Sequence, residues 1–359
     1  MSLEAVSWIL VAVLVYTYVG YGVVMASLVW LKSKLKSSTQ PRVGVRIDCT
    51  LIIAAWNEAE ILPARVKNLE TLTYGRGNLD VLFVTDGSND GSAEWLRQNT
   101  SYKVIHSSER RGKSAALNRA MEHVTTPAVA FTDANTILHP ESIDRLMAPY
   151  SDPEVGAIAG EKRVGLVLED SAHGAGEGMY WRYESTLKDW DSRLNTVVGA
   201  AGELFSVRTA LYEQLPADTI LDDFMVSLRV VEKGFRVAYV RDAWALEAPS
   251  LTLSDEMRRK TRICAGGFQA IFRLPGMLNV IKRPLAVFQY VSHRVFRWAV
   301  APFLLPAVLV LAAFLAATSV FWFFLFLLQA IFYASAIYGW CKRDSGVPAR
   351  FFYVPLYFT

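Results

Sequence analysis

Three polar residues stand directly after short apolar runs, in positions where a sheet would bring their side chains together. They are Asn57, Asp86 and Asp133. If the runs are parallel strands, all three residues lie at the carboxyl edge of the sheet, where open α/β sheets bind their ligands. Any one of them would more often be a turn residue or a helix cap. Three at equivalent positions favour a binding crevice.

Two common nucleotide-binding motifs do not fit this crevice. No G-x-G-x-x-G follows the first apolar run, which disfavours a dinucleotide. Gly112-Lys113-Ser114 is similar to the end of a P-loop, but that motif needs a glycine five residues before Gly112, and the chain has Ser107 there. A P-loop is therefore not expected.

The elements that must position these residues alternate between strand and helix. The apolar runs are Cys49–Trp56, Asp80–Thr85, Tyr102–His106 and Ala128–Thr132, and helical stretches are expected up to Leu72 and from about Ser114 to Val124. Buried parallel strands are continuously apolar, and their alternation with helices is typical of doubly wound sheets. We expect an α/β domain with a mostly parallel sheet.

Two long uncharged stretches flank this polar region. Ala5–Leu31 and the 44 residues Trp298–Cys341 contain no charged residue, and the chain is 52% hydrophobic with a mean hydropathy of +0.24. About 20 apolar residues cross a bilayer, so the first stretch predicts one span and the second predicts two, with a turn at Thr318 and Ser319. A cleaved signal peptide is disfavoured because no Lys or Arg precedes the first stretch.

Basic residues beside the spans predict the orientation of the polar region. They are Lys32, Lys34, Lys36 and Arg42 after the first span, Lys282, Arg283, Arg294 and Arg297 before the second, and Lys342 and Arg343 after the third. Basic flanks stay on the cytoplasmic side. We therefore expect an integral protein of a bacterial inner membrane, with its catalytic domain in the cytoplasm. The three cysteines form no metal-binding or thiol motif, and the charge distribution gives no sign of nucleic-acid binding.

An ordered series of motifs resembles the family 2 glycosyltransferases, in particular their cellulose-synthase-like and hyaluronan-synthase-like membrane branch. The motifs are Ala54-Ala55-Trp56-Asn57-Glu58, Thr85–Ser92, Gly112–Asn118, Thr132-Asp133-Ala134-Asn135, Tyr180–Glu184, Gly199–Phe205 and Leu221-Asp222-Asp223-Phe224. The resemblance implies a Rossmann-like domain of the GT-A type. It also implies an inverting transfer of a hexosyl or N-acetylhexosaminyl group from a nucleotide-sugar donor, with a UDP-sugar favoured.

The resemblance also implies which residues contact the donor. They are Ala55, Trp56, Glu58, Asp86 at the nucleobase, Lys113 near the diphosphate, and Asp133, Arg259 and Arg262. Negative charge builds on the leaving diphosphate, and a divalent cation, Mg²⁺ or Mn²⁺, can neutralise it. Asp133 and Asn135 are the expected metal ligands. Asn135 departs from the family pattern, which has a second Asp there, and it could instead be a turn residue.

The acidic pair Asp222-Asp223 is the expected catalytic pair. An inverting transfer needs a base that takes the proton of the acceptor hydroxyl. The family pattern implies Asp223 as this base and Asp222 as a capping or orienting partner, in a helix that ends near Gly234. Carboxylates at a helix N-terminus are also favoured by capping and by the helix dipole, which is the structural alternative.

The segment Arg258–Ile263 stands where processive members of the family carry Q-x-x-R-W. Arg262 takes the position of the Arg that contacts the diphosphate, Arg259 that of the Gln and Ile263 that of the Trp. The basic residues could also form a membrane-surface patch. The missing Trp removes a stacking platform for a sugar ring, which puts processive polymerisation in doubt. Gly202, Glu203 and Trp181 are the expected acceptor-side residues.

These expectations divide the chain into four parts and give it a set of partners. The parts are a first span with a basic linker (1–46), the GT-A domain (47–263), interfacial amphipathic helices (264–298) and two further spans (299–359). The partners are the nucleotide-sugar donor, a glycan or lipid-linked acceptor and membrane lipids, with a homo-oligomer or an export partner possible and nucleic acid not expected. Exopolysaccharide or cell-surface glycan synthesis is the expected role. A polyprenyl-phosphate monosaccharide transferase and a non-catalytic nucleotide-binding subunit of a glycan export assembly remain as alternatives.

Overall fold

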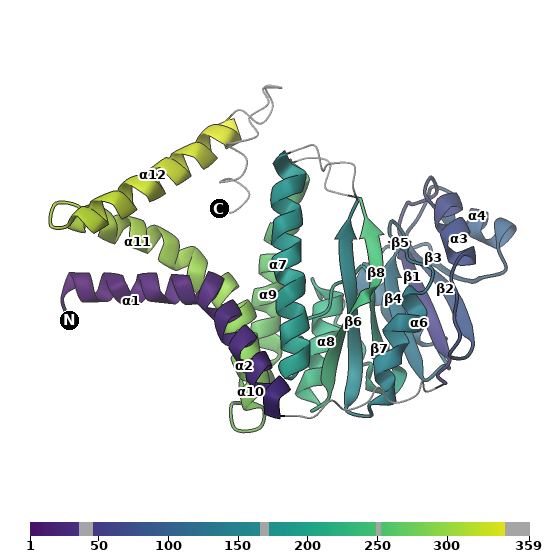
Figure 1. Cartoon of the computed structure of the whole chain (residues 1–359). Helices are drawn as coiled ribbons and strands as arrows, with labels where there is room; N and C mark the ends of the chain where they lie inside the picture. Colours follow the sequence, from purple (N-terminus) through teal and green to yellow (C-terminus); the bar gives the residue numbers. More distant parts are fainter. Residues whose placement is uncertain (36–45, 166–171, 249–252, 342–359) are drawn as a thin grey trace.

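The computed structural model describes residues 1–35, 46–165, 172–248 and 253–341. An α/β domain lies beside a group of long apolar helices, and two further helices lie between them (Figure 1). Lys36, Arg42, Lys342 and Arg343 of the predicted basic flanks fall outside the described residues.

Four parallel strands form one half of the sheet. They are β1 (Cys49–Ala55), β2 (Leu79–Asp86), β3 (Lys103–Ser107) and β4 (Ala128–Asp133), in the order β3-β2-β1-β4. Each begins within one residue of its predicted run. The predicted helices are also present, as α3 (Leu62–Glu70) and α5 (Lys113–Met121), and they end two to three residues earlier than predicted.

The other half of the sheet makes it mixed. β7 (Phe205–Arg208) runs antiparallel to β4 and to β6 (Val155–Val164), β6 is parallel to β8 (Arg236–Glu247), and β5 (Ile137–Leu138) is antiparallel to β8. The prediction of parallel strands therefore holds for β3, β2, β1 and β4. The antiparallel strand β7 was not predicted from the sequence.

Alternate residues of the central strands enter two different hydrophobic cores. Ile52 of β1 packs in one core with α5 and α8 (Asp222–Glu232), whereas Leu51 and Ile53 pack in the other, with α3, α4 (Ser92–Asn99) and α6 (Ser142–Met147). Successive side chains of a strand point to opposite faces of the sheet. Both faces are covered, which explains why the runs are continuously apolar.

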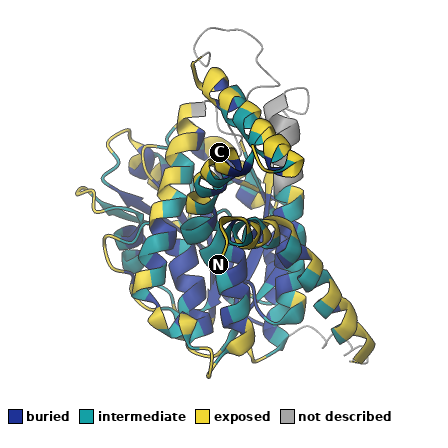
Figure 2. Cartoon of the chain, turned by 90° about the vertical axis from the view of Figure 1, so that its left-hand side faces the viewer, coloured by how far each residue is buried: buried dark blue, intermediate teal, exposed yellow. Residues whose placement is uncertain are grey.

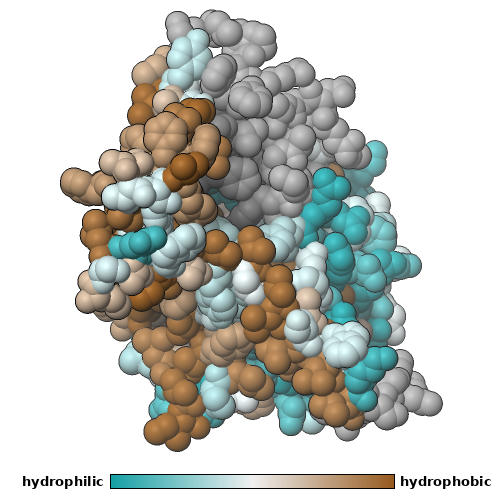
Figure 3. All heavy atoms as spheres, turned by 60° about the vertical axis from the view of Figure 1, so that its left-hand side comes forward, coloured by the Kyte–Doolittle hydropathy of each residue, from teal (hydrophilic) through white to brown (hydrophobic). Residues whose placement is uncertain are grey.

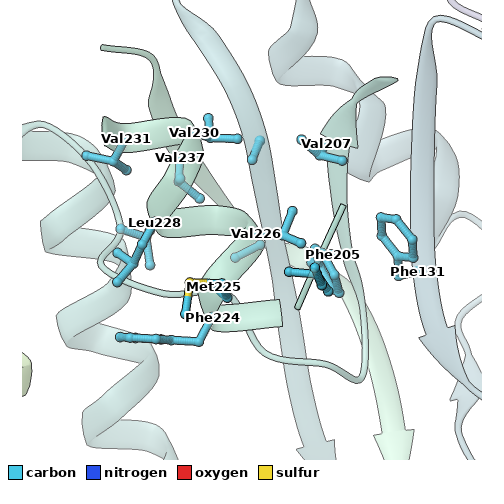
Figure 4. Close-up of a cluster of buried hydrophobic side chains, with 14 of the residues drawn as sticks. Phe131, Phe205, Val207, Phe224, Met225, Val226, Leu228, Val230, Val231 and Val237 are labelled. Carbon is cyan, nitrogen blue, oxygen red and sulfur yellow. The ribbon is translucent and has the colours of Figure 1, made fainter. Parts of the chain in front are cut away.

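The core behind the start of α8 holds that helix against the sheet. Phe131 of β4 stacks on Phe205 of β7 with ring centroids 4.8 Å apart, and Phe224 of α8 lies in the same cluster (Figure 4). Gly234 follows the helix with φ +96°, and the N–H of Phe235 donates to the carbonyl of Val230. This is the predicted glycine cap.

Three helical stretches are long and apolar enough to cross a membrane: Leu3–Leu35, Pro284–Leu315 and Val320–Cys341. The first comprises α1 (Leu3–Val15), the π-helical η1 (Tyr16–Gly20) and α2 (Tyr21–Leu35); the second comprises α10 (Pro284–Tyr290), the π-helical η6 (Val291–Val300) and α11 (Ala301–Leu315); the third is α12 (Val320–Cys341). Thr318 and Ser319 lie in the turn between α11 and α12, as predicted.

The surfaces of these helices match a membrane environment. Apolar residues gather on the side of the molecule that they form (Figure 3), and many of them are exposed (Figure 2). α1 packs on α11, and α11 on α12. The chain is therefore a membrane protein with three candidate spans. The first stretch bends between α1 and α2 (Figure 1), where the π-helical turn interrupts the regular hydrogen bonding.

Two long helices connect the sheet to the spans. α7 (Ala172–Leu194) packs on α2 and α9 (Leu253–Arg273) packs on η6. α9 continues without a break through residue 263, and the second span begins at Pro284, before residue 299. The four predicted parts stay predictions, and two of their boundaries fall inside continuous helices. Short 3-10 turns complete the described elements: η2 (Ala148–Ser151), η4 (Thr209–Leu211) and η5 (Pro275–Leu278).

A buried polar network joins the first span to α7 and η6. The hydroxyl of Tyr21 in α2 donates to Asp191 of α7, and His293 Nδ1 lies 2.7 Å from Asp191 Oδ2. Gln289 Nε2 donates to the carbonyl of Asp191 at 2.9 Å. Tyr21, Asp191, Gln289 and His293 are all fully buried. The network thus connects α7 to the first and the second apolar stretch through one carboxylate.

Candidate functional site

Asp86 and Asp133 are the last residues of β2 and β4, on either side of β1. In the register, Asp133 stands opposite Ala54, and Thr85, the neighbour of Asp86, stands opposite Ala55. Asn57 follows β1 in a left-handed conformation with φ +53°. The sheet therefore brings all three predicted residues to one edge.

The carboxylate of Asp86 holds the loop that follows β3. Its Oδ2 accepts hydrogen bonds from the backbone N–H of Arg111 at 2.8 Å and of Gly112 at 2.6 Å, and its Oδ1 pairs with Arg119 at 2.6 Å. Asp86 is 5% exposed. Gly87 has φ +68°, and a Cβ there would lie 2.8 Å from the Cα of Arg110, so the loop can pack against it only if residue 87 is glycine. Both Asp86 oxygens are thus engaged by the chain itself.

Trp56 and Glu58 lie on the same edge, closer to the solvent. Trp56 is 44% exposed, and the guanidinium carbon of Arg110 lies 3.4 Å from the centroid of its ring. Burial, with contributions from the nearby Asp133 and Asp90 carboxylates, raises the pKa of Glu58. Ala55 is buried at the end of β1. Trp56 and Glu58 form a partly exposed rim with an aromatic face.

A cavity of about 250 Å³ lies between this edge and the helices α7, α9 and η6. The predicted residues that line it are Lys113, Asp133, Trp181, Gly202, Glu203, Asp222, Asp223, Arg259 and Arg262. Ala55, Trp56, Glu58, Asp86 and Asn135 do not line it. The structure therefore brings together the residues expected at the catalytic, diphosphate and acceptor positions. It leaves four of the expected donor-binding residues and the expected metal ligand Asn135 outside the cavity.

Lys113 links the sheet edge to the acidic pair of α8. Its Nζ lies 2.7 Å from Asp133 Oδ1 and 3.4 Å from Asp222 Oδ2. A Cβ added at Gly202 would lie 3.4 Å from Asp223 Oδ2 and 3.6 Å from Lys113 Nζ, which places all of these groups around one point. Burial opposes the charge of Lys113, but the surrounding carboxylates outweigh it and raise the pKa of the ammonium group.

The two carboxylates at the start of α8 have different surroundings. The N-cap position is Leu221 and no side chain caps the helix, so Asp222 does not have the capping role expected from its position. Asp222 lies near Lys113 instead, whereas Asp223 Oδ1 accepts only the N–H of Phe224, at 2.8 Å, from the described residues. Burial and the negative charge of Asp222 raise the pKa of Asp223 to about 7. A carboxylate in this range can take a proton at neutral pH.

A buried lysine holds Glu203, one of the residues predicted on the acceptor side, in place. Lys162 Nζ lies 2.6 Å from Glu203 Oε1 and also pairs with Glu247. Burial opposes ionisation of Glu203, but Lys162 outweighs it and lowers the pKa to about 2. Lys162 and Glu247 were not predicted from the sequence. The available signal for Lys162 was a charged triplet, Glu161 to Arg163, inside an otherwise apolar run.

The helical side of the cavity carries a second ion-pair cluster. Arg294 and Arg297 of η6 both pair with Glu184 of α7, at 2.9 and 2.8 Å, and Arg259 of α9 forms two hydrogen bonds with Glu256. Burial opposes ionisation of Glu184, but Arg294, His293 and Arg297 hold its pKa well below the usual range. Arg294 and Arg297 were expected to lie at the membrane interface, and their place in the lining of the cavity was not predicted.

Asp133 and Asn135 offer two oxygen ligands on one turn. Asp133 Oδ2 and Asn135 Oδ1 accept no hydrogen bond from any residue within the described ranges, while the Asn135 amide nitrogen lies 3.5 Å from Glu247 Oε1. Among the described residues, no group of three or more His, Cys, Asp or Glu side chains could hold a metal ion alone. The pair suits a hard cation that takes its remaining ligands from phosphate oxygens and water, as Mg²⁺ does in nucleotide sites.

Comparisons with known proteins agree with this arrangement. Residues 50–215 match the family described as Glycosyl transferase family 2. The poly-beta-1,6-N-acetyl-D-glucosamine synthase of Staphylococcus aureus (strain COL) is 23% identical over 268 residues, which cover 70% of this chain and 63% of that protein. Glycosyltransferase AglE of Haloferax volcanii is 30% identical over 128 residues, covering 34% of this chain and 40% of that protein.

The fold is also found in a solved structure over nearly the whole chain. The mannosyltransferase PcManGT from Pyrobaculum calidifontis, in complex with GDP-Man and Mn²⁺, has a TM-score of 0.71 at 22% identity. The match covers 99% of this chain and 96% of that one. The predicted GT-A architecture with flanking membrane helices is confirmed.

Proposed function

We propose that this chain, whose residues 50–215 match Glycosyl transferase family 2, is a membrane-embedded, inverting glycosyltransferase. It transfers a sugar from a nucleotide-sugar donor to a glycan or lipid-linked acceptor, in exopolysaccharide or cell-surface glycan synthesis. The observation that carries this proposal is the single cavity in which Asp133, Asp223 and Arg262 meet beside the membrane helices.

The size of the cavity indicates how the donor lies. Pockets that enclose a whole drug-sized ligand have about 300–1,000 Å³, whereas this cavity has about 250 Å³. We place the sugar and the diphosphate in the cavity, next to Lys113 and Arg262, and the nucleoside on the rim formed by Trp56 and the Asp86 loop. In this arrangement Asp86 acts on the nucleoside through the loop that it holds.

The transfer itself needs a hydroxyl nucleophile and a base. The acceptor oxygen forms a bond to C1 of the donor sugar while the bond from C1 to the diphosphate oxygen breaks, and the acceptor proton passes to Asp223. Asp223 suits this task because its pKa of about 7 leaves it able to accept a proton at neutral pH. Lys113 neutralises Asp133 and Asp222 beside the leaving diphosphate. Inversion follows because the nucleophile enters opposite the leaving group.

We also propose that the site binds a divalent cation. The Mn²⁺ ion in the complex of the similar mannosyltransferase supports this. Asp133 and Asn135 would hold it. When bound, it neutralises charge on the leaving diphosphate.

The orientation of the protein is also a proposal. Lys32 and Lys34 close the first span, and Lys282 and Arg283 precede the second. By the positive-inside rule these flanks place the α/β domain in the cytoplasm, at a bacterial inner membrane. Nucleotide sugars are made in that compartment, which fits the proposed donor.

A donor screen tests the proposal. The full-length protein in detergent or lipid nanodiscs is incubated with UDP- and GDP-sugars, and released nucleotide is measured with Mg²⁺, with Mn²⁺ and with EDTA. The N-acetylglucosamine in the name of the staphylococcal relative and the GDP-Man of the solved complex make UDP-N-acetylglucosamine and GDP-mannose the first donors. We expect metal-dependent release from one donor class, abolished in Asp223→Asn. Tight nucleotide binding without turnover of any sugar would instead indicate a non-catalytic binding subunit.

A further inference from the structure

The cavity has two walls of opposite charge. Its sheet-side wall carries two lysines and five carboxylates: Lys113, Lys162, Asp133, Glu203, Asp222, Asp223 and Glu247. Its helical wall, formed by α7, α9 and η6, carries five cations and one carboxylate: Lys188, Arg259, Arg262, Arg294, Arg297 and Glu184. A ligand that touches the helical wall is therefore selected for negative charge.

Lys188 is the most informative residue of the helical wall. It is 3% exposed and lines the cavity, but no described residue accepts a hydrogen bond from its ammonium group or forms an ion pair with it. Its Nζ lies 6.0 Å from the centroid of the Trp181 ring, and its charge contributes to the lowered pKa of Glu203. The carboxylates nearby are held by other cations, Glu184 by Arg294 and Arg297, and Glu203 by Lys162.

Among the described residues the Lys188 ammonium group has no acceptor, so it can donate hydrogen bonds to a ligand in the cavity that it lines. The group has three N–H donors. An anion in the cavity would supply the missing acceptors, and the segregated charge of the wall would hold it there.

The helical wall is also the membrane side of the cavity. α7 packs on α2 of the first span, and η6, which carries Arg294 and Arg297, is part of the stretch Pro284–Leu315 that is long and apolar enough to cross a membrane. A ligand with an anionic group on an apolar tail could therefore reach this wall from the bilayer while its tail stays among lipids.

We propose that Lys188, Arg294 and Arg297, on the part of the helical wall formed by α7 and η6, bind the phosphate or diphosphate of a lipid-linked saccharide acceptor, with Lys188 as a direct ligand of a phosphate oxygen. Arg262 of α9 remains with the donor diphosphate. This inference rests on the proposed function and narrows its acceptor. The attacking atom is a sugar hydroxyl of the acceptor, facing Asp223 on the opposite wall, and not a phosphate oxygen. An ionised phosphate has no proton to lose, so it would need no base. Bond formation at C1, loss of the nucleoside diphosphate and proton transfer to Asp223 are unchanged.

The test compares three acceptor probes with the donor found in the screen. They are farnesyl diphosphate-linked N-acetylglucosamine, the phosphate-free farnesyl N-acetylglucosaminide and farnesyl phosphate. The full-length protein, Lys188→Met, Lys188→Arg and the control Arg193→Met are assayed for product, for acceptor KM, and for donor KM in the hydrolysis reaction without acceptor. Arg193 is on the same helix and pairs with Asp189 at the surface, so its loss removes a cation outside the cavity.

The expected result is a preference of the wild type for the diphosphate-linked sugar over the phosphate-free one. Lys188→Met should raise the acceptor KM for the diphosphate-linked probe about tenfold to a hundredfold, the usual effect of losing one charged hydrogen bond. It should leave the phosphate-free probe and the donor KM unchanged. Lys188→Arg should restore most of the preference, and Arg193→Met should behave as the wild type.

Three results would overturn the inference. The first is equal use of the two sugar probes by the wild type. The second is an increase in the donor KM of Lys188→Met, which would assign Lys188 to the donor diphosphate. The third is a preference for farnesyl phosphate as acceptor, which would make phosphate the nucleophile. If no donor is turned over at all, the proposed function has failed; if a donor is turned over without phosphate preference, only this inference has failed.

Discussion

Replacing Asp223 by Asn should inactivate the protein and at the same time make it more stable. The substitution keeps the size of the side chain and removes its charge. Asp223 lies beside Asp222 at the start of α8, where burial and the second carboxylate oppose its ionisation. The native residue is therefore held in the charged form at a cost to the fold, as is common for groups whose pKa serves a reaction.

The magnitude follows from the pKa. A rise from 3.8 to about 7, at about 1.36 kcal/mol per pKa unit, gives at most roughly 4 kcal/mol of lost stability above pH 7. Between pH 3.8 and 7 the folded protein keeps a proton that the unfolded chain has released, so this group lowers stability as the pH rises through that window. Asn does not titrate, and the variant should gain most above pH 7 and progressively less towards pH 4. Loss of a general base should lower transfer about 10²- to 10⁴-fold.

The assay is thermal unfolding of the full-length variant in detergent at about pH 5 and about pH 8, next to transfer measurements. Asp218→Asn is the control, since Asp218 is an exposed carboxylate in the preceding loop that pairs with Arg273. It should change neither stability nor transfer appreciably. An Asp223→Asn variant that melts at the wild-type temperature at pH 8, or gains equally at both pH values, would refute the electrostatic reasoning. Near-normal transfer would refute the base assignment.

Four further outcomes are expected. The transfer rate of the wild type should rise with pH as one group of pKa about 7 loses its proton and then level off, in a pH profile of kcat/KM; a flat profile would remove Asp223 as the base. Asp133→Ala should abolish the stimulation of nucleotide release by Mn²⁺, which a metal titration measures. Arg262→Met should raise the donor KM about tenfold, measured in the hydrolysis assay. Gly199→Ala should lower the melting temperature, because residue 199 has φ +107° and its Cβ would lie 2.2 Å from the Phe224 ring; an unchanged melting curve would show that this loop adapts.

The parallel half of the fold and its binding edge could be predicted from the sequence, because local pattern determines them. Continuously apolar runs that end in Asn57, Asp86 and Asp133 give both the strands and their common edge. The candidate membrane spans could be predicted equally well. A helix can cross a bilayer when it has about 20 consecutive apolar residues without charges, and this can be read directly from the sequence. The glycine after α8 ends the helix where its conformation was expected to do so.

The rest of the site depends on contacts between residues far apart in the sequence. Nothing near Lys162 in the sequence predicts its two partners. The pairing of β7 with β6 brings Glu203, which precedes β7, to Lys162, and the parallel pairing of β8 with β6 brings Glu247 to it. Likewise, whether Arg294 and Arg297 face lipid or the cavity is decided by the packing of η6 against α7 and α9. Local periodicity does not contain that information.

The hydrogen bond from Tyr21 to Asp191 has a consequence for the geometry of the reaction. The same carboxylate also binds His293 of the second span, so two segments that enter the bilayer are fixed to one helix of the catalytic domain. The domain then cannot tilt freely over the lipid surface, and Asp223 keeps one height above it. The distance of Asp223 from the bilayer therefore limits the length of the polar part of an acceptor. The acceptor hydroxyl must reach the reacting carbon while the lipid anchor remains in the bilayer.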